Sequence, residues 1–317
     1  MQVKTLIQVE MDLSKMIEEV SCPICGKSNS KKFTKYNGWT IMRCQNCKTC
    51  YTNPRPTSEA LPHYYNDKYF SGDRFLNPTY NPNAIEWNKI SDIESWIEKR
   101  GALLEIGAAN GSFLKSMKNR GWNVYGIDIS ADAAVAGKKE YGIEIFCGVA
   151  KDYKPKVKFD AICLYQTFEH LPDPNSVMEQ CFQWLNPGGL LVIEVPNINS
   201  FDMIYSRERK ILSYDLPRHL VHFNAKTLSG ALEKHGFRII NTSFYYPQFL
   251  LSITECIQSK RKQIPVAEIL KDEISMPVTD QNVPMLLKPS GRKQQILNAI
   301  SNFFPGWRMT ITAKKPI

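Results

Sequence analysis

Long apolar segments are what this 317-residue chain most clearly lacks. No stretch approaches the ~20 consecutive apolar residues of a membrane-spanning helix, so we expect no such helix. Residues 1–20 carry acidic side chains and no apolar core of a signal peptide, so we expect a cytoplasmic protein. Internal repeats and low-complexity tracts are also missing, which argues against a repeat architecture.

The composition is that of a globular protein with more than one part. A hydrophobic content of 43% is enough for burial, and the length exceeds one typical core. The formal net charge of +9 leaves an anionic partner open, whether a phosphorylated substrate, nucleic acid or a lipid surface. The 40 basic residues are scattered, with small clusters at 260–262 and 292–293, so a solvated surface is the favoured interpretation.

Cysteine is concentrated near the amino terminus, where residues 22–50 hold five of the nine. Cys22 and Cys25 form one Cys-x2-Cys knuckle, and Cys44 and Cys47 form a second after 18 intervening residues. This spacing is typical of a zinc ribbon, and in a reducing compartment metal explains the clustering better than disulfides do. Four thiolates fill a tetrahedral Zn²⁺ ion, so the predicted metal is structural.

Four further cysteines are assigned to packing. Cys50 is a fifth thiol near the knuckles, and we interpret it as a small buried side chain rather than a ligand. Cys147, Cys163 and Cys181 lie in or beside predicted strands and helices, so they are expected in the core.

A glycine-containing loop dominates the middle of the chain. A short apolar strand at 103–106 leads into a loop with Gly107 and Gly111, and a second strand at 124–128 ends on Asp128. Glycines let backbone N–H groups approach a ligand, and a carboxylate at the next strand's end can accept both hydroxyls of a ribose. The unit therefore predicts an adenosine-containing ligand.

The glycine spacing excludes a dinucleotide. A dinucleotide fingerprint starting at Gly107 requires glycine two and five residues later, where this chain has Ala109 and Ser112. The pyrophosphate interpretation therefore fails at two of three positions.

With Glu105 before the loop, the pattern resembles the first motif of class I S-adenosylmethionine-dependent methyltransferases. In that family an acid at the position of Asp128 holds the ribose. Ala109 departs from the family's usual middle glycine by adding a methyl group where backbone meets cofactor. The cofactor-binding residues that the resemblance implies are Glu105, Gly107, Ala109, Gly111, Asp128, Ile129 and Gln166.

Strands and helices alternate along the rest of the chain, which predicts an α/β fold. Helices are expected at 131–141 and 174–185. The resemblance implies a seven-stranded Rossmann-like sheet with helices on both faces, preceded by a small zinc ribbon and closed by an antiparallel edge hairpin. The seven expected strands are 103–106, 124–128, 143–146, 159–165, 190–195, 237–245 and 309–314.

Other motifs resemble a subset of bacterial and archaeal methyltransferases. These carry a Cys-Pro-x-Cys ribbon with an Asn-Pro-Arg-Pro turn, matched here at 22–56, and a Tyr-Tyr-rich connector, matched at 61–70. After the fifth strand they carry Leu-Pro-Arg-His-Leu-x-His-Phe, matched at 216–223. Relatives methylate carbon or oxygen of nucleotide-linked sugars, so the resemblance implies a small polar acceptor, a nucleotide-linked sugar or glycan.

The expected organisation has four parts, and the oligomeric state stays open. Residues 246–305 have apolar positions at helical spacing with basic residues nearby. They are expected to form a helical lid before the last strand, and docking on a membrane surface is the less favoured alternative. The parts are an extension (1–20), the ribbon (21–58), a Tyr-rich connector (59–85) and the methyltransferase domain (86–317).

Methyl transfer from a sulfonium requires an acceptor about 3 Å from the methyl group and, for a hydroxyl or activated carbon, a base. Histidine suits this role. His219 is the first candidate, with His170 and His222 as alternatives, and a purely structural role stays open for them. Arg218 and Tyr65 are the expected substrate-binding residues, since a guanidinium can bind a phosphate or carboxylate bidentately.

Competing functions differ in what they need from the sequence. Methylation of base amino groups uses an Asn/Asp-Pro-Pro-aromatic loop, absent from 164–167, and cytosine C5 chemistry needs a Pro-Cys dipeptide, which does not occur. An rRNA or tRNA methyltransferase that holds RNA with its ribbon is an alternative, but 27–42 has few aromatics and no RNA-recognition signature. A non-catalytic zinc adaptor is a third hypothesis, for which Ala109 is the only support.

Overall fold

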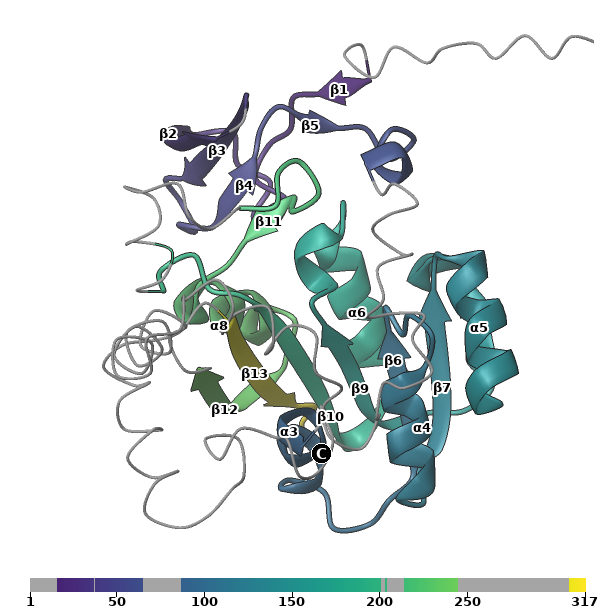
Figure 1. The fold of residues 1–317 in the computed structure, drawn as a ribbon. Coiled ribbons are helices and arrows are strands. Elements are labelled where there is room, and N and C mark those ends of the chain that lie inside the picture. Colours follow the sequence, from purple (N-terminus) through teal and green to yellow (C-terminus); the bar gives the residue numbers. More distant parts are fainter. Residues whose placement is uncertain (1–15, 37, 65–86, 201–202, 204–213, 245–307) are drawn as a thin grey trace, which may run out of the picture.

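The computed structural model describes residues 16–36, 38–64, 87–200, 203, 214–244 and 308–317 (Figure 1). Tyr65, most of the connector at 59–85 and the expected lid at 246–305 lie outside the described residues. Among the helices that are described, none has both the length and the apolar character needed to cross a membrane.

A seven-stranded sheet forms the centre of the molecule, in the order β12-β13-β10-β9-β6-β7-β8. The five strands from β10 to β8 are parallel, and β13 pairs antiparallel with both β10 and β12, so the expected edge hairpin is confirmed. The strands are β6 (Ala102–Ile106), β7 (Asn123–Asp128), β8 (Ile145–Cys147), β9 (Phe159–Tyr165), β10 (Leu185–Pro196), β12 (Arg238–Phe244) and β13 (Arg308–Lys314).

The sheet is buried on both faces. Successive side chains of its central strands point to opposite faces and pack in two separate cores. Ile162 and Leu164 of β9 pack in one cluster, whereas Ala161 and Cys163 pack in the other. A continuous apolar run, not an alternating one, is what such a strand requires. The predicted α/β fold, with seven strands and helices on both faces, is therefore confirmed.

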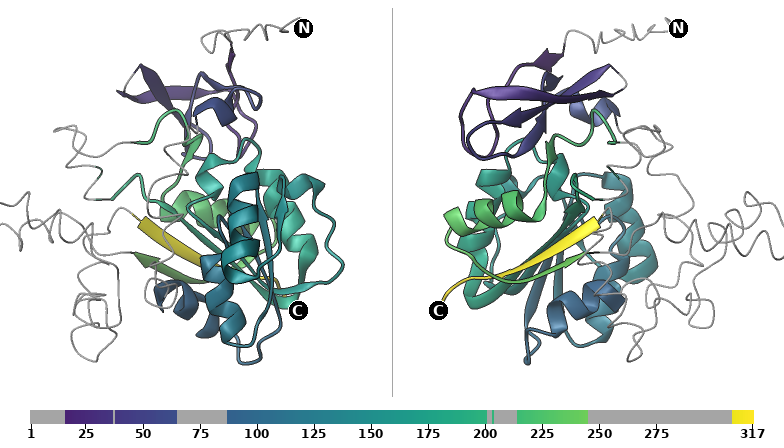
Figure 2. Two further views of the ribbon diagram at one scale, coloured as in Figure 1. Left: turned by 45° about the vertical axis from the view of Figure 1, so that its right-hand side comes forward. Right: turned by 90° about the vertical axis from the view of Figure 1, so that its left-hand side faces the viewer.

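Helices cover the two faces in sequence order (Figures 1 and 2). Helices α3 (Trp87–Glu94) and α4 (Ser112–Asn119) pack in one core, and α6 (Pro174–Trp184) and α8 (Ala225–Lys234) pack in the other. Side-chain caps fix where α6 and α8 begin: Asp173 accepts from the backbone N–H of Ser176 at the start of α6, and Asn224 accepts from that of Thr227 at the start of α8. The fifth helix of this domain, α5 (Ala131–Tyr141), packs beside β7 and β8.

A second, smaller sheet is formed mainly by the cysteine-rich amino-terminal segment. Its order is β11-β4-β3-β2, and its strands are β2 (Ser30–Tyr36), β3 (Trp39–Cys44), β4 (Cys50–Thr52) and β11 (Val221–His222). Strand β11 pairs antiparallel with β4, although it follows β10 in the chain. The pair β1 (Ile17–Glu18) and β5 (Arg55–Pro56) extends this region. The small sheet therefore contains a strand from the part of the chain that forms the large sheet.

Two local expectations need correction. Cys147 was expected in the core but is exposed, because β8 is a three-residue strand at the sheet edge and Cys147 is its last residue. This third strand also begins two residues later than expected, at Ile145 instead of residue 143. Cys163 and Cys181 are buried, as predicted.

Candidate active site and metal centre

The glycine loop connects β6 to α4 through left-handed backbone. Gly107 has φ +82°, and a Cβ there would lie 2.1 Å from Thr167 Oγ1, so only glycine fits. Gly111 has φ +75° at the start of α4. Ala109 also adopts a positive φ, +46°, a conformation that alanine adopts less readily than glycine.

Asp128 ends β7 directly beside this loop. Its Oδ2 accepts a hydrogen bond from Ala109 N at 2.7 Å, and its Oδ1 accepts one from Ser130 N at 2.9 Å. Burial raises the pKa of this carboxyl, and the N–H donors oppose that shift. The glycine loop and Asp128, which are at least 17 residues apart in the sequence, thus form one site.

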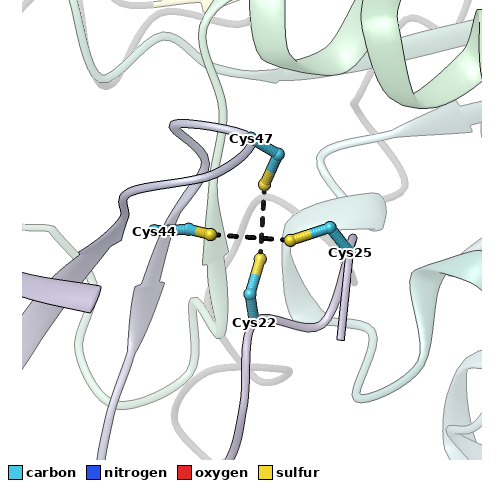
Figure 3. A group of neighbouring side chains, drawn as sticks. All are labelled: Cys22, Cys25, Cys44 and Cys47. Carbon is cyan, nitrogen blue, oxygen red and sulfur yellow. Dashed lines mark hydrogen bonds between the residues drawn. The ribbon is translucent and has the colours of Figure 1, made fainter. Parts of the chain in front are cut away.

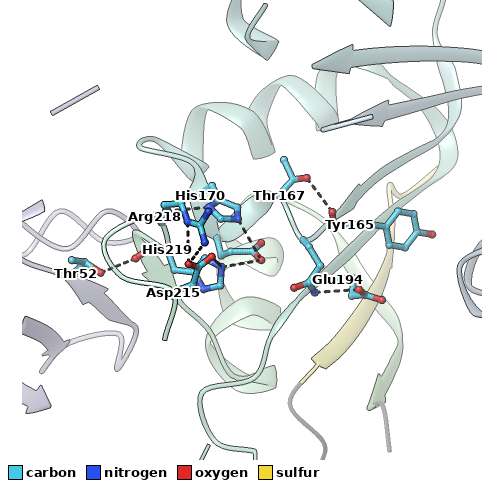
Figure 4. Close-up of polar contacts among 10 residues, drawn as sticks. Thr52, Tyr165, Thr167, His170, Glu194, Asp215, Arg218 and His219 are labelled. Carbon is cyan, nitrogen blue, oxygen red and sulfur yellow. Dashed lines mark hydrogen bonds and ion pairs between the residues drawn. The ribbon is translucent and has the colours of Figure 1, made fainter. Parts of the chain in front are cut away.

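The other expected cofactor residues lie around this loop. Glu105, on β6, is buried, and Ile129, after Asp128, exposes 55% of its surface. Gln166 follows β9 with φ +52°, and its Nε2 donates to Glu194 Oε1 at 3.1 Å. Glu194 and Thr167 are shown beside Tyr165 in Figure 4.

Two histidines, His170 and His219, lie close together beyond the end of β9 (Figure 4). His170 ends the short helix η4 (Phe168–His170), and His219 lies two residues before β11. Their ring centroids are 4.6 Å apart. Oε1 of Glu169 is 4.0 Å from His170 Nε2 and 3.9 Å from His219 Nε2. The fold therefore brings two of the predicted catalytic residues to one carboxylate.

The surroundings of these groups oppose charge. Burial raises the pKa of Glu169 well above its usual value, and neither carboxylate oxygen has a hydrogen-bond partner among the described residues. Burial lowers the pKa of His170 to about 4 and that of His219 well below its usual value. Asp215 Oδ2 lies 3.4 Å from His219 Nε2. Neutral imidazoles therefore face a carboxyl group that lacks the hydrogen bonds its charged form needs.

Arg218 is held by a neighbouring acid. Its Nε donates to Asp215 Oδ1 at 3.0 Å, its Nη2 contacts the same oxygen, and its backbone carbonyl lies 3.1 Å from His170 Nδ1. A role in substrate binding stays a prediction.

Thr52 of the small sheet holds the histidine segment in place. Its hydroxyl donates to the carbonyl of His219 at 2.7 Å and lies 3.1 Å from His222 Nε2. A hydroxyl has one proton, so His222 Nε2–H must be the donor of the second contact. This ties up the His222 nitrogen that faces Thr52. Sequence reasoning missed Thr52, Glu169 and Asp215 as parts of this site, because only the fold brings them together.

The four predicted zinc ligands converge in the ribbon (Figure 3). The Sγ atoms of Cys22 and Cys47 lie 3.4 Å apart, those of Cys25 and Cys44 lie 3.5 Å apart, and all four fall within 4.8 Å of one another. Tetrahedral Zn²⁺ with Zn–S bonds of about 2.3 Å places its sulfurs about 3.8 Å apart, so these residues fit the ion. Cys50 is buried outside the group, and burial raises its pKa to about 11.

Two contacts attach the ribbon to the larger domain. The side-chain amide of Asn175, on α6, donates to the carbonyls of Pro23 and Ile24 in the first knuckle. Arg55 Nη1 donates to the carbonyl of Pro172, just before α6. The cysteine group therefore lies against the same end of the sheet as the histidines.

Comparison with known proteins assigns about half of the chain to a family. Residues 85–242 match the family model of a methyltransferase domain. The chain contains a methyltransferase domain. Its fold resembles that of a SAM-dependent methyltransferase from Archaeoglobus fulgidus, with a TM-score of 0.50 and 20% identity over 79% of this chain and 100% of that chain. Phosphoethanolamine N-methyltransferase 2 of Haemonchus contortus, solved with S-adenosyl-L-methionine, gives a TM-score of 0.50 at 16% identity, over 90% of this chain and 71% of that chain.

Curated relatives match less than half of this chain. A ubiquinone biosynthesis O-methyltransferase of Pseudomonas aeruginosa is 30% identical over an alignment of 156 residues, and the match covers 44% of this chain. The match spans 61% of that relative's own length.

Proposed function

We propose that this protein transfers the methyl group of S-adenosylmethionine to a small polar acceptor. The observation that carries the proposal is the Asp128 carboxylate, fixed by two backbone N–H groups beside the glycine loop. An acid at this place can accept hydrogen bonds from both ribose hydroxyls of an adenosine. The residues that would hold the cofactor are Glu105, Gly107, Ala109, Gly111, Asp128, Ile129 and Gln166.

The residues around the loop suggest how the cofactor is held. The exposed Ile129 offers an apolar surface to a flat base next to the ribose. Gln166, fixed by Glu194, would lie at the methionine end. When bound, the sulfonium cofactor supplies an activated methyl group, and the protein's task is to place an acceptor in line with it.

The acceptor would bind toward the histidines. Thr167 lies against Gly107, and His170 follows it by three residues, so the histidine group begins beside the cofactor loop. His219 would take the acceptor's proton, with His170 and His222 as alternatives. Arg218 and Tyr65 would bind the substrate. Burial lowers the pKa of His219, so its imidazole alone would be a weak base for the acceptor's proton.

A nucleotide-linked sugar or glycan is the acceptor that we propose. Its support is the resemblance of 22–56 and 216–223 to the ribbon-bearing subset of the family. The match to a methyltransferase domain favours an enzyme over the inactive adaptor, whose only support is Ala109. The backbone N–H of Ala109 still reaches Asp128.

We further propose that Cys22, Cys25, Cys44 and Cys47 hold one structural Zn²⁺ ion. Four thiolates leave no coordination position for substrate, so the ion would hold the two knuckles together and take no part in methyl transfer.

Calorimetry with S-adenosylmethionine tests the proposed function before any acceptor is known. We expect one binding site per chain, and no binding would overturn the proposal. Mass spectrometry of nucleotide sugars incubated with the protein and methyl-labelled cofactor then identifies the acceptor. Label transfer to RNA with none to sugars would favour the RNA alternative.

A further inference from the structure

We propose that Glu169, His170 and His219 form a second metal site, for a divalent transition-metal ion. One carboxylate oxygen and two imidazole nitrogens lie within 4.8 Å of one another. Two of the separations, from Glu169 Oε1 to the two Nε2 atoms, are 4.0 and 3.9 Å. Unlike the cysteine group, this cluster matches no ligand spacing evident in the sequence.

The spacing is close to that of a bound ion. Ligands with metal bonds of about 2.1 Å lie roughly 3.0–3.4 Å apart in octahedral or tetrahedral geometry. The observed separations exceed this range by less than an ångström. Small side-chain rotations of the carboxylate and the two rings would close the difference without moving the strands.

The position of the ring proton of His170 suits a metal ligand. Its Nδ1 lies 3.1 Å from the carbonyl oxygen of Arg218, and a carbonyl can only accept a hydrogen bond. Nδ1 therefore carries the proton, and Nε2 turns a lone pair toward Glu169. A backbone carbonyl bound to the far ring nitrogen is the usual outer partner of a metal-binding histidine.

Glu169 supplies an independent reason for a cation. Its side chain is 2% exposed, and neither carboxylate oxygen has a hydrogen-bond partner in the described part of the chain. A buried carboxylate without partners is costly, and a cation between the carboxylate and the imidazoles removes that cost. The carboxylate of Asp215 also lies 3.4 Å from His219 Nε2, but Arg218 balances its charge, so Glu169 alone supplies this reason for a cation.

The donor set identifies the class of ion. Two imidazoles and one carboxylate suit Zn²⁺, Fe²⁺, Mn²⁺ or Co²⁺, whereas Mg²⁺ and Ca²⁺ prefer oxygen ligands. Three protein ligands leave positions open, as in catalytic metal sites. If the proposed function is right, an acceptor hydroxyl at an open position would become more acidic, and His219 would act as a ligand rather than as a base.

Cobalt titration of the full-length protein tests the site without an acceptor. After the metal is removed and replaced by Co²⁺, we expect two ions per chain with different absorption spectra. Tetrathiolate cobalt in the ribbon absorbs strongly through its sulfur ligands, and the second ion should give the weaker spectrum of nitrogen and oxygen ligands. A single ion per chain with the thiolate spectrum alone would overturn the proposal.

Variants assign the second ion to its ligands. Glu169→Gln and His219→Ala should each lower affinity for the second ion at least about 100-fold, beyond the 10–100-fold cost of losing an outer partner. Both should keep the thiolate spectrum. His235→Ala is the matched control, because His235 Nδ1 lies 2.9 Å from Ala231 O at the end of α8 and His235 is not in the cluster; it should keep both ions.

Two further readouts keep the result interpretable. Circular dichroism identifies a variant that has failed to fold, and the wild-type stoichiometry decides the proposal in that case. S-adenosylmethionine binding, measured in the same preparations, separates the two proposals: cofactor binding without a second ion overturns the metal site alone. A second ion without cofactor binding overturns the proposed function alone.

Discussion

The two groups of potential metal ligands in this chain are built in opposite ways. The cysteine group comes from two knuckles of four residues each, in which a Cys-x2-Cys spacing already brings ligands together. The Glu169, His170 and His219 group needs β10 and the segment before β11 to bring its third member back to η4. Local spacing reveals the first group, and only the fold reveals the second.

Their dependence on metal should differ for the same reason. The short ribbon has few apolar residues of its own, so its ion would replace a core. The histidine group lies at the end of a sheet that packs in two cores without it. Loss of ribbon metal should therefore unfold structure, whereas loss of the second ion should leave the fold intact.

Removing a ribbon ligand should have the largest effect. Cys22→Ser should abolish zinc binding at the ribbon, where binding contributes on the order of 10–16 kcal/mol in isolated zinc fingers, and lower the melting temperature markedly. Cys50→Ser is the control and should keep both zinc and stability. Elemental analysis with thermal unfolding measures both, and a metal-free Cys22→Ser protein as stable as wild type would contradict the comparison.

Asp128→Ala should weaken cofactor binding and leave both metal groups unchanged. Loss of hydrogen bonds to a charged acceptor costs about 1.5–3 kcal/mol, so the affinity for S-adenosylmethionine should fall about 10- to 150-fold by calorimetry. Asp132→Ala, a nearby acid in the first turn of α5, is the matched control. Equal affinities in the two variants would show that Asp128 does not hold the ribose.

Thr52→Val should reveal how strongly the two regions are coupled. It removes the hydrogen bond to the carbonyl of His219, a net loss of about 0.5–1.5 kcal/mol. Affinity for the second ion should fall about 2- to 10-fold while the ribbon keeps its zinc. Thr52→Ser restores the hydroxyl and should restore affinity, and a serine variant as weak as valine would point to packing instead. Thr312→Val, a buried threonine in β13, is the control and should bind both ions normally.

A third region, far from both groups, should affect the pH dependence of stability and not metal binding. Glu94 binds Arg120, Arg100 and Trp122, and the Arg120 guanidinium leads in lowering the pKa of Glu94 to about 2. The charged form is therefore favoured in the folded protein, so its stability is present above about pH 4.5 and is lost as the pH falls toward 2.

The dependence of the unfolding free energy on pH below 4.5 measures the contribution of the Glu94 carboxylate. Because Arg100 is largely exposed, we expect on the order of 1–2 kcal/mol. Glu94→Gln should flatten the profile of unfolding free energy between pH 4.5 and 2 in denaturant titrations. An unchanged profile would assign the acid sensitivity to other carboxylates.

Sequence patterns predicted what depends on neighbours along the chain. The seven strands followed from apolar runs between turn residues, and the loop with Asp128 followed from glycine spacing. Cys147 was placed wrongly because an apolar neighbourhood does not show whether a strand lies at the edge. The site residues themselves stay predictions, although the structure places most of them close together.

The histidine group was beyond sequence reasoning for a physical reason. Strand β11 has two residues, too few to show alternation, and its partner β4 lies about 170 residues earlier. Glu169 looked like any acid before a histidine. Its burial, which makes it chemically interesting, depends on Leu220 N–H reaching its carbonyl from the returning segment.

The pairing of β11 with β4 also limits how this protein can be recombined. A cassette cut after residue 58 would take three strands of the small sheet and leave its fourth, Val221–His222, in the remaining chain. The remaining chain would keep Val221–His222 without its partner strand β4. The transferred ribbon would carry β4 with an unpaired edge, to which strands of other chains can add. Exchange between relatives should therefore succeed only when the ribbon and its distant strand are exchanged together.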